Sequence, residues 1–232
     1  MDIGSGHNPV EETGWWEEGD MQQYKFTNMD LYHSKANEKW DFNDLPYRFS
    51  DDTFDAVFAR HTLEHVRRDM FVNVMKEIHR VAKEGATVYI RVPYWNSESY
   101  AGDPTHWNMF CETTFRHFCY GGSLSTEFYV PPLFEMVSIE HRFHPKLRLV
   151  PKKLLKELMH ILSGICDEMW VVLKVVKSDS GPVREYEPKR TYAFNRPVQW
   201  RYAFAYGALL YGVGGVVFLA LLDLVLRFLG LL

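Results

Sequence analysis

Residues 1–9 read MDIGSGHNP, a very short apolar run that passes directly into a glycine-rich turn. Asp2, Gly4 and Gly6 form the pattern Asp-x-Gly-x-Gly. Glycines in such a turn remove the side chains that would keep a bound molecule away from the backbone. A longer apolar run would be expected before it. Either the natural start lies further upstream, or the strand at the centre of the predicted sheet is short.

Strand-like and helix-like runs alternate over residues 1–177, which predicts a layered α/β fold. Apolar residues recur at helical spacing between residues 67 and 85, with Gly85 as the predicted helix stop, and an amphipathic helix is predicted over residues 151–165. The two strands that flank the second helix are expected at the outer edge of the sheet. The predicted strands are residues 24–32, 54–60, 86–94, 134–143 and 169–177.

Asp30 ends the second predicted strand, where a carboxylate can accept hydrogen bonds from the two hydroxyls of a ribose. The residues that follow Gly6 include Pro9 and several acids, which make a poor environment for phosphate. We therefore expect a cofactor that contains a ribose and lacks phosphate.

Several segments together resemble class I S-adenosylmethionine-dependent methyltransferases of the type 11-like kind. MDIGSGHNP resembles the family's first motif, and Asp30 resembles its ribose-binding acid. WDFNDLPYRFSDDTFDAVFARHTLEHV (40–66) is similar to its long signature, and EIHRVAKEGATVYIRVP (77–93) to its helix, glycine turn and fifth strand. The resemblance covers about residues 1–177. It implies S-adenosylmethionine as cofactor and a Rossmann-like sheet, mostly parallel with one antiparallel edge strand.

The same resemblance implies which residues contact the cofactor. Gly4 and Gly6 would face its methionine and ribose, Asp30 would bind the ribose hydroxyls, and Leu31 would lie beside the adenine. Asp41 would accept from the adenine amino group. The full implied set is Asp2, Gly4, Ser5, Gly6, Asp30, Leu31, Asp41, Phe42 through its backbone amide, and Arg60 and His61 near the methionine end.

His106 is the predicted catalytic base, with Asp103 as the residue that orients it. Both lie in PYWNSESYAGDPTHWNMFCETTF (93–115), which resembles a subgroup with Asp-Pro-Thr-His after the fifth strand. Methyl transfer mainly requires a positioned nucleophile, and imidazole titrates in the range that suits removal of a hydroxyl proton. The alternative is a rigid turn in which Asp103 caps the next helix.

A second reading applies to HTLEH (61–65), which satisfies the His-x-x-Glu-His pattern of inverted zinc peptidases. The pattern lies directly after a predicted strand and inside the methyltransferase-like signature. We therefore expect no metal site here and interpret Glu64 and His65 as residues that cap and pack the following helix.

Composition limits the remaining possibilities. A net charge of −4 without a basic block in the first 180 residues gives no reason to expect a nucleic acid partner. Three cysteines without metal spacing fit a reducing compartment, and the polar, acidic N-terminal region does not resemble a signal peptide.

The C-terminal residues differ in kind from the rest. Residues 203–222 carry no charge, and a helix of about 20 uncharged residues matches the thickness of a bilayer core. We expect a methyltransferase domain over 1–177, a linker over 178–202 and a transmembrane or membrane-inserted helix over 203–232. The basic residues before this stretch place the catalytic domain in the cytoplasm on the positive-inside rule. A buried hairpin of two core helices is the alternative.

These predictions together describe a membrane-anchored methyltransferase that O-methylates a lipid-linked sugar, polysaccharide precursor or glycolipid at the cytoplasmic membrane face. A quinone or lipid methyltransferase is the alternative enzyme. A catalytically inactive, membrane-anchored scaffold is the alternative that is not an enzyme. The acceptor atom does not follow from sequence, because acceptor pockets in this fold are built from variable insertions. The oligomeric state stays open.

Overall fold

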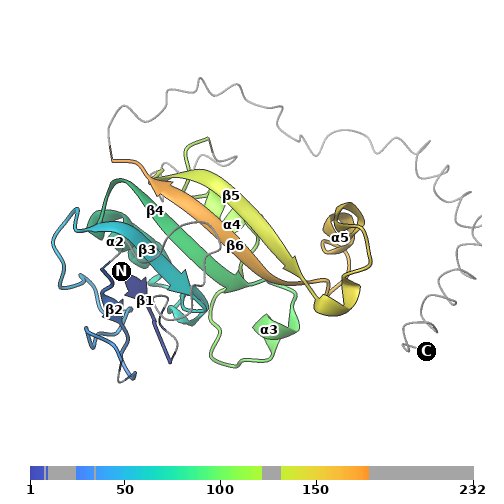
Figure 1. Cartoon of the computed structure of the whole chain (residues 1–232), viewed down its shortest axis with the longest axis horizontal. Helices are drawn as coiled ribbons and strands as arrows, with labels where there is room; N and C mark the ends of the chain where they lie inside the picture. Colours follow the sequence, from blue (N-terminus) through green and yellow to red (C-terminus); the bar gives the residue numbers. More distant parts are fainter. Residues whose placement is uncertain (8, 10–24, 34, 122–131, 178–232) are drawn as a thin grey trace, which may run out of the picture. The chain divides into compact units, whose positions relative to one another are not determined.

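A mixed β-sheet forms the centre of the computed structural model, which describes residues 1–7, 9, 25–33, 35–121 and 132–177 (Figure 1). Within these residues the strand order is β2-β1-β3-β4-β6-β5. The strands are β1 (Asp2–Ile3), β2 (Asn28–Met29), β3 (Phe54–Arg60), β4 (Ala82–Pro93), β5 (Phe134–Phe143) and β6 (Cys166–Val175). This order confirms a Rossmann-like α/β sheet.

The shortest strands lie where the sequence places the glycine turn. β1 has two residues and pairs in parallel with β2 on one side and β3 on the other. Asp2 is the register partner of both Asn28 and Phe58. β1 is thus flanked by β2, which also has two residues, and by the seven-residue β3, and its carboxyl end leads straight into Gly4.

The antiparallel strand lies inside the sheet and not at its edge, so that part of the prediction is wrong. β6 pairs antiparallel with β4 and also antiparallel with β5. β5 is consequently the edge strand, and it runs parallel to β4. The chain reaches β5 first and returns through α5 (Lys152–Leu158) into β6, which fills the place between β4 and β5.

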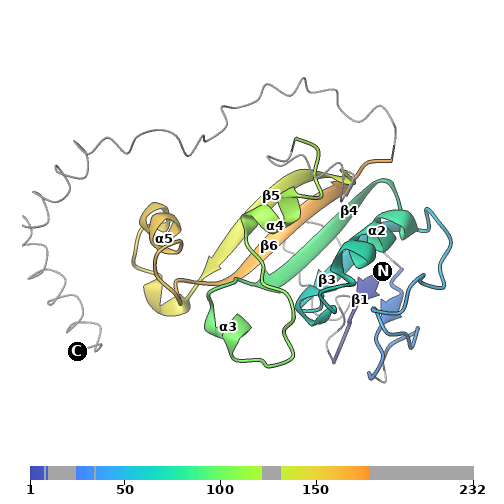
Figure 2. The same cartoon turned by 180° about the vertical axis from the view of Figure 1, so that it is seen from behind.

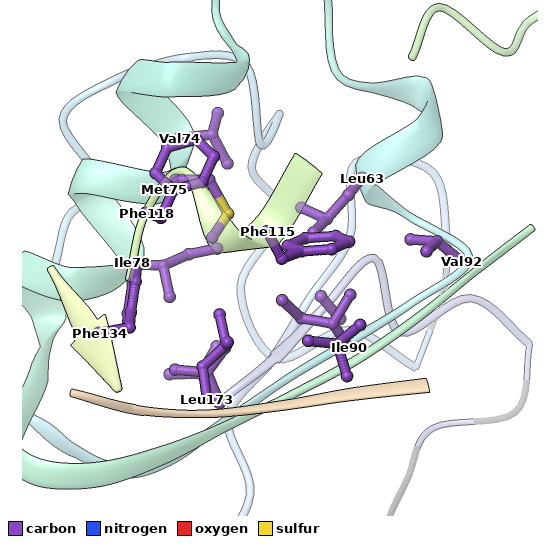
Figure 3. Packing of buried hydrophobic residues seen from close by; sticks show 14 of the residues in the cluster. Leu63, Val74, Met75, Ile78, Ile90, Val92, Phe115, Phe118, Phe134 and Leu173 are labelled. Carbon is purple, nitrogen blue, oxygen red and sulfur yellow. The ribbon is translucent and has the colours of Figure 1, made fainter. Parts of the chain in front are cut away.

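Two helices cover one face of the sheet (Figure 2). They are α2 (Phe71–Val81) and α4 (Glu112–Arg116). Val74, Met75 and Ile78 of α2 recur at helical spacing and are fully buried. They belong to one hydrophobic cluster with Phe115 of α4 and Leu173 of β6, which Figure 3 shows from close by.

Helix α2 ends earlier than the sequence predicts, and β4 starts at once. The backbone turns extended at Ala82, and Gly85 lies inside β4 with a φ of +74°. The register with β3 shifts at this point, so Gly85 provides a bulge in the strand and does not stop the helix. A short helix α3 (Glu98–Ala101) follows β4 in the loop at its carboxyl end.

The prediction of a transmembrane helix is wrong for the part of the chain that the structure describes. No helix there is long and apolar enough to cross a bilayer, so the described fold is an α/β domain without such a helix. The expected helix over 203–232 and the expected linker over 178–202 lie outside the described residues.

Candidate functional site

The carboxyl ends of the parallel strands β1 to β4 meet at one edge of the sheet, and Gly4, Asp30 and His61 directly follow three of these ends. Ligands of open α/β sheets bind at this edge. Gly4 follows β1 with a φ of +65°, and its amide donates to the carbonyl of Met29 at 2.7 Å. A Cβ on Gly4 would come within 2.4 Å of Thr62 Oγ1. Glycine is therefore required here by the approach of Thr62.

Asp30 ties the glycine turn to the end of β2. The amide of Gly6 donates to Asp30 Oδ2 at 3.0 Å, and the amides of Tyr32 and His33 donate to Oδ1 at 2.9 Å each. These three bonds occupy both lone-pair sites of Oδ1 and one of Oδ2, so one lone-pair site stays free on Oδ2. The structure thus brings Gly4, Gly6 and Asp30 together as predicted, with Leu31 next to them and 39% exposed.

The turn has the properties that a cofactor without phosphate requires. Ser5 is 1% exposed, and its Oγ has no hydrogen-bond partner within the described residues. Gly6 has a φ of +56°, and a Cβ there would meet nothing closer than 3.9 Å, so the turn leaves space on this side. An orphaned hydroxyl, an open backbone and a carboxylate fit the polar groups of an adenosyl ligand.

Asp41 and Phe42 lie in a separate turn. Asp41 Oδ1 accepts from the backbone amide of Asn43 at 2.8 Å and from its side chain at 3.0 Å. Asn43 Oδ1 in turn accepts from the amide of Arg67, which fixes the turn beside the start of α2. The adenine contacts predicted for Asp41 and Phe42 stay predictions, because these hydrogen bonds hold the turn itself.

Arg60 is the last residue of β3, and His61 leaves the strand with a φ of +48°, a conformation that costs a non-glycine residue free energy. Burial lowers the pKa of Arg60. The His61 ring is held between two carboxylates: Nδ1 lies 3.2 Å from Glu64 Oε1, and Nε2 lies 3.2 Å from Glu168 Oε1.

The ion pairs of this network determine its charge. Burial opposes protonation of His61, but its hydrogen bonds to Glu168 and Glu64 outweigh burial and raise its pKa to about 9. Burial likewise opposes ionisation of Glu168, but the bonds from His61 and Arg91 prevail and lower its pKa to about 2. Arg91 donates to both oxygens of Glu168 at 2.7 and 2.8 Å. The ring of His61 is thus a cation in a fixed orientation.

Glu168 and Arg91 were not predicted as site residues. They meet diagonally across the antiparallel pair of β6 and β4, where Glu168 lies opposite Pro93, and they are 77 positions apart in the chain. The alternation of each strand shows which residues share a face, but the pairing of the two strands is needed to bring these together. No local motif marks either residue.

The loop between β4 and α4 carries the predicted base. Nδ1 of His106 lies 3.0 Å from the carbonyl oxygen of Tyr100, and Nε2 lies 3.7 Å from Asp103 Oδ2. Asp103 accepts from the amide of Thr105 at 2.8 Å and from its hydroxyl at 2.6 Å. Asp103 thus closes its own turn, and the N-cap of helix α4 is Cys111 instead.

HTLEH adopts a different geometry from the one a peptidase needs. Residues Leu63–His65 form a single 3₁₀ turn, and both ring nitrogens of His61 face carboxylates. The His61–His65 ligand pair of the peptidase reading is therefore not available. His65 instead lies edge-on to His106, with ring centroids 4.8 Å apart.

An open hollow of about 440 Å³ adjoins this loop. It is lined mostly by polar and acidic groups: Glu98, Ser99, Gly102, Asp103, His144 and Asp167. Burial raises the pKa of Asp167. Two nearby aromatic residues of the loop, Trp95 and Trp107, are 41% and 57% exposed.

A family model described as a methyltransferase domain matches residues 18–90. This range includes Asp30, Asp41, Arg60 and His61. No curated protein matches the sequence.

Solved structures with a similar fold include several methyltransferases. One is a S-adenosylmethionine-dependent methyltransferase from Archaeoglobus fulgidus, with a TM-score of 0.50, 17% identity, and coverage of 75% of this chain and 84% of that one. Another is 1,6-didemethyltoxoflavin-N1-methyltransferase from Burkholderia thailandensis with bound 1,6-didemethyltoxoflavin and S-adenosylhomocysteine, with a TM-score of 0.47, 14% identity, and coverage of 76% and 70%. At these identities the likeness concerns the fold.

Proposed function

We propose that this chain, whose residues 18–90 match a model described as a methyltransferase domain, is a class I, S-adenosylmethionine-dependent methyltransferase, and that it methylates a hydroxyl group of a carbohydrate acceptor, such as a lipid-linked sugar, polysaccharide precursor or glycolipid. S-adenosylmethionine supplies a methyl group on a sulfonium, and transfer to a hydroxyl breaks the carbon–sulfur bond as the carbon–oxygen bond forms. The chain's own residues have to hold the cofactor, place the hydroxyl and accept its proton.

The cofactor-holding residues are those of the glycine turn and its carboxylate. The free lone pair of Asp30 Oδ2 suits a ribose hydroxyl, and the orphaned Oγ of Ser5 suits a second polar atom of the ligand. Leu31, apolar and partly exposed beside Asp30, suits the face of an adenine. The orphaned, buried Ser5 hydroxyl within this cradle is the observation that carries the assignment.

The proton acceptor in this proposal is Nε2 of His106. A carbonyl oxygen only accepts hydrogen bonds, so the bond to Tyr100 requires the proton of a neutral ring on Nδ1. Nε2 then has its lone pair available, and Asp103 Oδ2 at 3.7 Å stabilises the ring once it is protonated. Asp103 is well suited because hydrogen bonds from Thr105 lower its pKa.

The hollow next to this loop favours a sugar over a quinone. Carboxylates such as Glu98, Asp103 and Asp167 accept hydrogen bonds from sugar hydroxyls, and the exposed faces of Trp95 and Trp107 suit the apolar side of a sugar ring. A quinone acceptor would need a deep pocket without charged groups, and this hollow is open and has three carboxylates in its lining.

The test has two stages. Calorimetry with S-adenosylmethionine is expected to show one bound molecule, with affinity at least about 10-fold weaker in Asp30→Ala and unchanged in Asp69→Ala, an exposed carboxylate outside the site. Incubation of the protein with cofactor tritiated on the methyl group and a membrane extract then identifies the acceptor. We expect label in glycan or glycolipid. Label in quinone would overturn the acceptor, and absence of binding would overturn the assignment of the turn.

The cellular location is proposed on composition alone. Residues 203–222 carry no charge, and they are the reason to place the protein at the cytoplasmic face of a membrane. Fractionation of cells that express the full chain tests this: recovery in the membrane fraction supports the location, and recovery in the supernatant contradicts it.

A further inference from the structure

Three side chains of the kinds that ligate metals lie close together after the ends of β3 and β4. Glu64, His65 and His106 each place one potential ligand atom within 4.8 Å of those of the other two. Two of them belong to the turn after β3, and the third belongs to the loop after β4. Glutamate with two histidines is a ligand set found in zinc sites of proteins.

Both histidines are held in the tautomer that a metal ligand needs. Nδ1 of His106 donates to the carbonyl oxygen of Tyr100. The hydroxyl of Thr105 donates to Asp103, so it accepts from Nδ1 of His65 at 3.0 Å. Each ring therefore keeps the lone pair of its Nε2 free. Metal-ligating histidines in general have their ring fixed in this way, by a hydrogen bond from the other ring nitrogen.

Glu64 offers an oxygen that the protein does not use. Its side chain is fully buried, and Oε1 faces His61, while Oε2 has no hydrogen-bond partner within the described residues. A buried carboxylate oxygen without a partner costs free energy. A cation beside Oε2 would remove this cost.

The two segments are fastened to each other, which keeps the three side chains close. The carbonyl oxygen of Glu64 accepts from the amide of Trp107 at 2.7 Å. The side-chain amide of Asn108 donates to the carbonyl oxygens of Leu63 and Val66 at 3.1 and 2.5 Å. A site held on fastened segments loses little freedom when it binds an ion.

We propose that Glu64, His65 and His106 form a binding site for a zinc ion, with the lone pairs of the two Nε2 atoms and Glu64 Oε2 as ligands. The ligands of a tetrahedral zinc ion lie about 3.3 Å apart, and each of the three side chains has a potential ligand atom within 4.8 Å of the other two, so the ligand atoms have to move closer together to bind the ion. Small side-chain rotations provide this. A water molecule or the exposed carboxylate of Asp103 would take the fourth position.

The zinc site stands on its own geometry and does not depend on the proposed acceptor chemistry. The zinc site nevertheless affects the proposed methyl transfer. While zinc holds Nε2 of His106, that nitrogen accepts no proton. Zinc occupancy and base catalysis by His106 therefore exclude each other, and zinc is expected to inhibit methyl transfer.

Metal binding is measured on the full chain after chelator treatment, by competition with a colorimetric zinc indicator. The rings of His7 and His33 also lie in contact and offer a second possible zinc site. The titrations therefore use a protein with His33→Ala, so that only zinc at the proposed site is counted. One zinc ion per chain is expected. Its affinity should fall by about 100-fold in His106→Ala or His65→Ala and by about 10-fold or more in Glu64→Gln. His160→Ala, which removes an exposed histidine elsewhere, should leave it unchanged.

Cobalt(II) provides a second readout, because a tetrahedral site gives it a visible absorption band that hexahydrated cobalt lacks. The band should appear with wild type and be absent with His106→Ala. The proposal is overturned if the parent protein binds no zinc, or if it binds zinc equally in the ligand variants that unfold at the same urea concentration as wild type. Cofactor calorimetry on the same samples separates this result from failure of the proposed function.

Discussion

His61 is a half-buried cation whose charge depends on two carboxylates from different parts of the chain. Its pKa of about 9 in the folded protein lies above the ordinary value of 6.5 for an unfolded histidine. A raised folded pKa means that the folded state binds the proton more tightly. The ring therefore contributes stability that is complete below about pH 6.5 and is lost as the pH rises through 9.

The raised pKa of His61 in the folded protein leads to a prediction for the variant His61→Gln. The free energy of unfolding of the variant should lie below that of wild type at pH 6, and the gap should narrow as the pH rises to 9.5, because wild type has then lost the charge of His61. Urea unfolding at pH 6, 7.5 and 9.5 measures the gap. A gap of constant size would show that His61 acts through packing alone. Carbon-13 NMR of the wild-type ring should give a titration midpoint near pH 9.

Gly4 and Gly6 share a positive φ but have different surroundings, which makes them a matched pair. Ala at position 4 would bring a Cβ to 2.4 Å from Thr62 Oγ1, and Ala at position 6 would meet nothing closer than 3.9 Å. Gly4→Ala is expected to cost about 3 kcal/mol of stability, and Gly6→Ala about 1 kcal/mol from the strained φ alone. Urea unfolding of both variants checks this, and equal losses would contradict the close approach of Thr62.

At the scale of elements, β6 connects the core with the ion-pair network. Val171 of β6 is fully buried under the helices, whereas Val137 on the neighbouring strand β5 is 58% exposed. Val171→Ala should cost about 2 kcal/mol, and the identical change at Val137 less than about 0.5 kcal/mol. Denaturant unfolding of the two variants measures the difference. Similar values would mean that β6 does not lie in the core.

The elements also show what the sequence could and could not predict. The strand over 54–60 and the strand over 134–143 have the predicted bounds, because each is a run of apolar and alternating residues between clear breaks. The place of β6 between β4 and β5 could not be predicted from the local sequence, since it depends on pairing between segments that are distant in the chain. The same holds for the site: Asp30 and the glycines follow from a motif, whereas Glu168 reaches His61 only through the sheet order.

At the scale of the whole molecule, the sheet edge joins two groups of residues with separate tasks. The ends of β1 and β2 carry the proposed cofactor cradle, and the ends of β3 and β4 carry the histidines and the loop with Asp103. His61 lies at the boundary, with its backbone amide donating to the carbonyl of Arg91. Occupancy of the cradle should therefore stabilise the sheet as one unit.

The last prediction follows from this coupling. Any ligand that binds only the folded protein adds stability by mass action, about 2.7 kcal/mol at a concentration 100 times its Kd. For a domain of this size S-adenosylhomocysteine should then raise the Tm by about 5 to 10 °C. The Asp30→Ala variant should show a much smaller rise at the same concentration, since its weaker binding leaves less ligand-linked stability, whereas Asp69→Ala should match wild type. Thermal scans with and without ligand measure this, and an unchanged Tm in wild type would mean that the Gly4–Gly6 turn with Asp30 does not hold the cofactor.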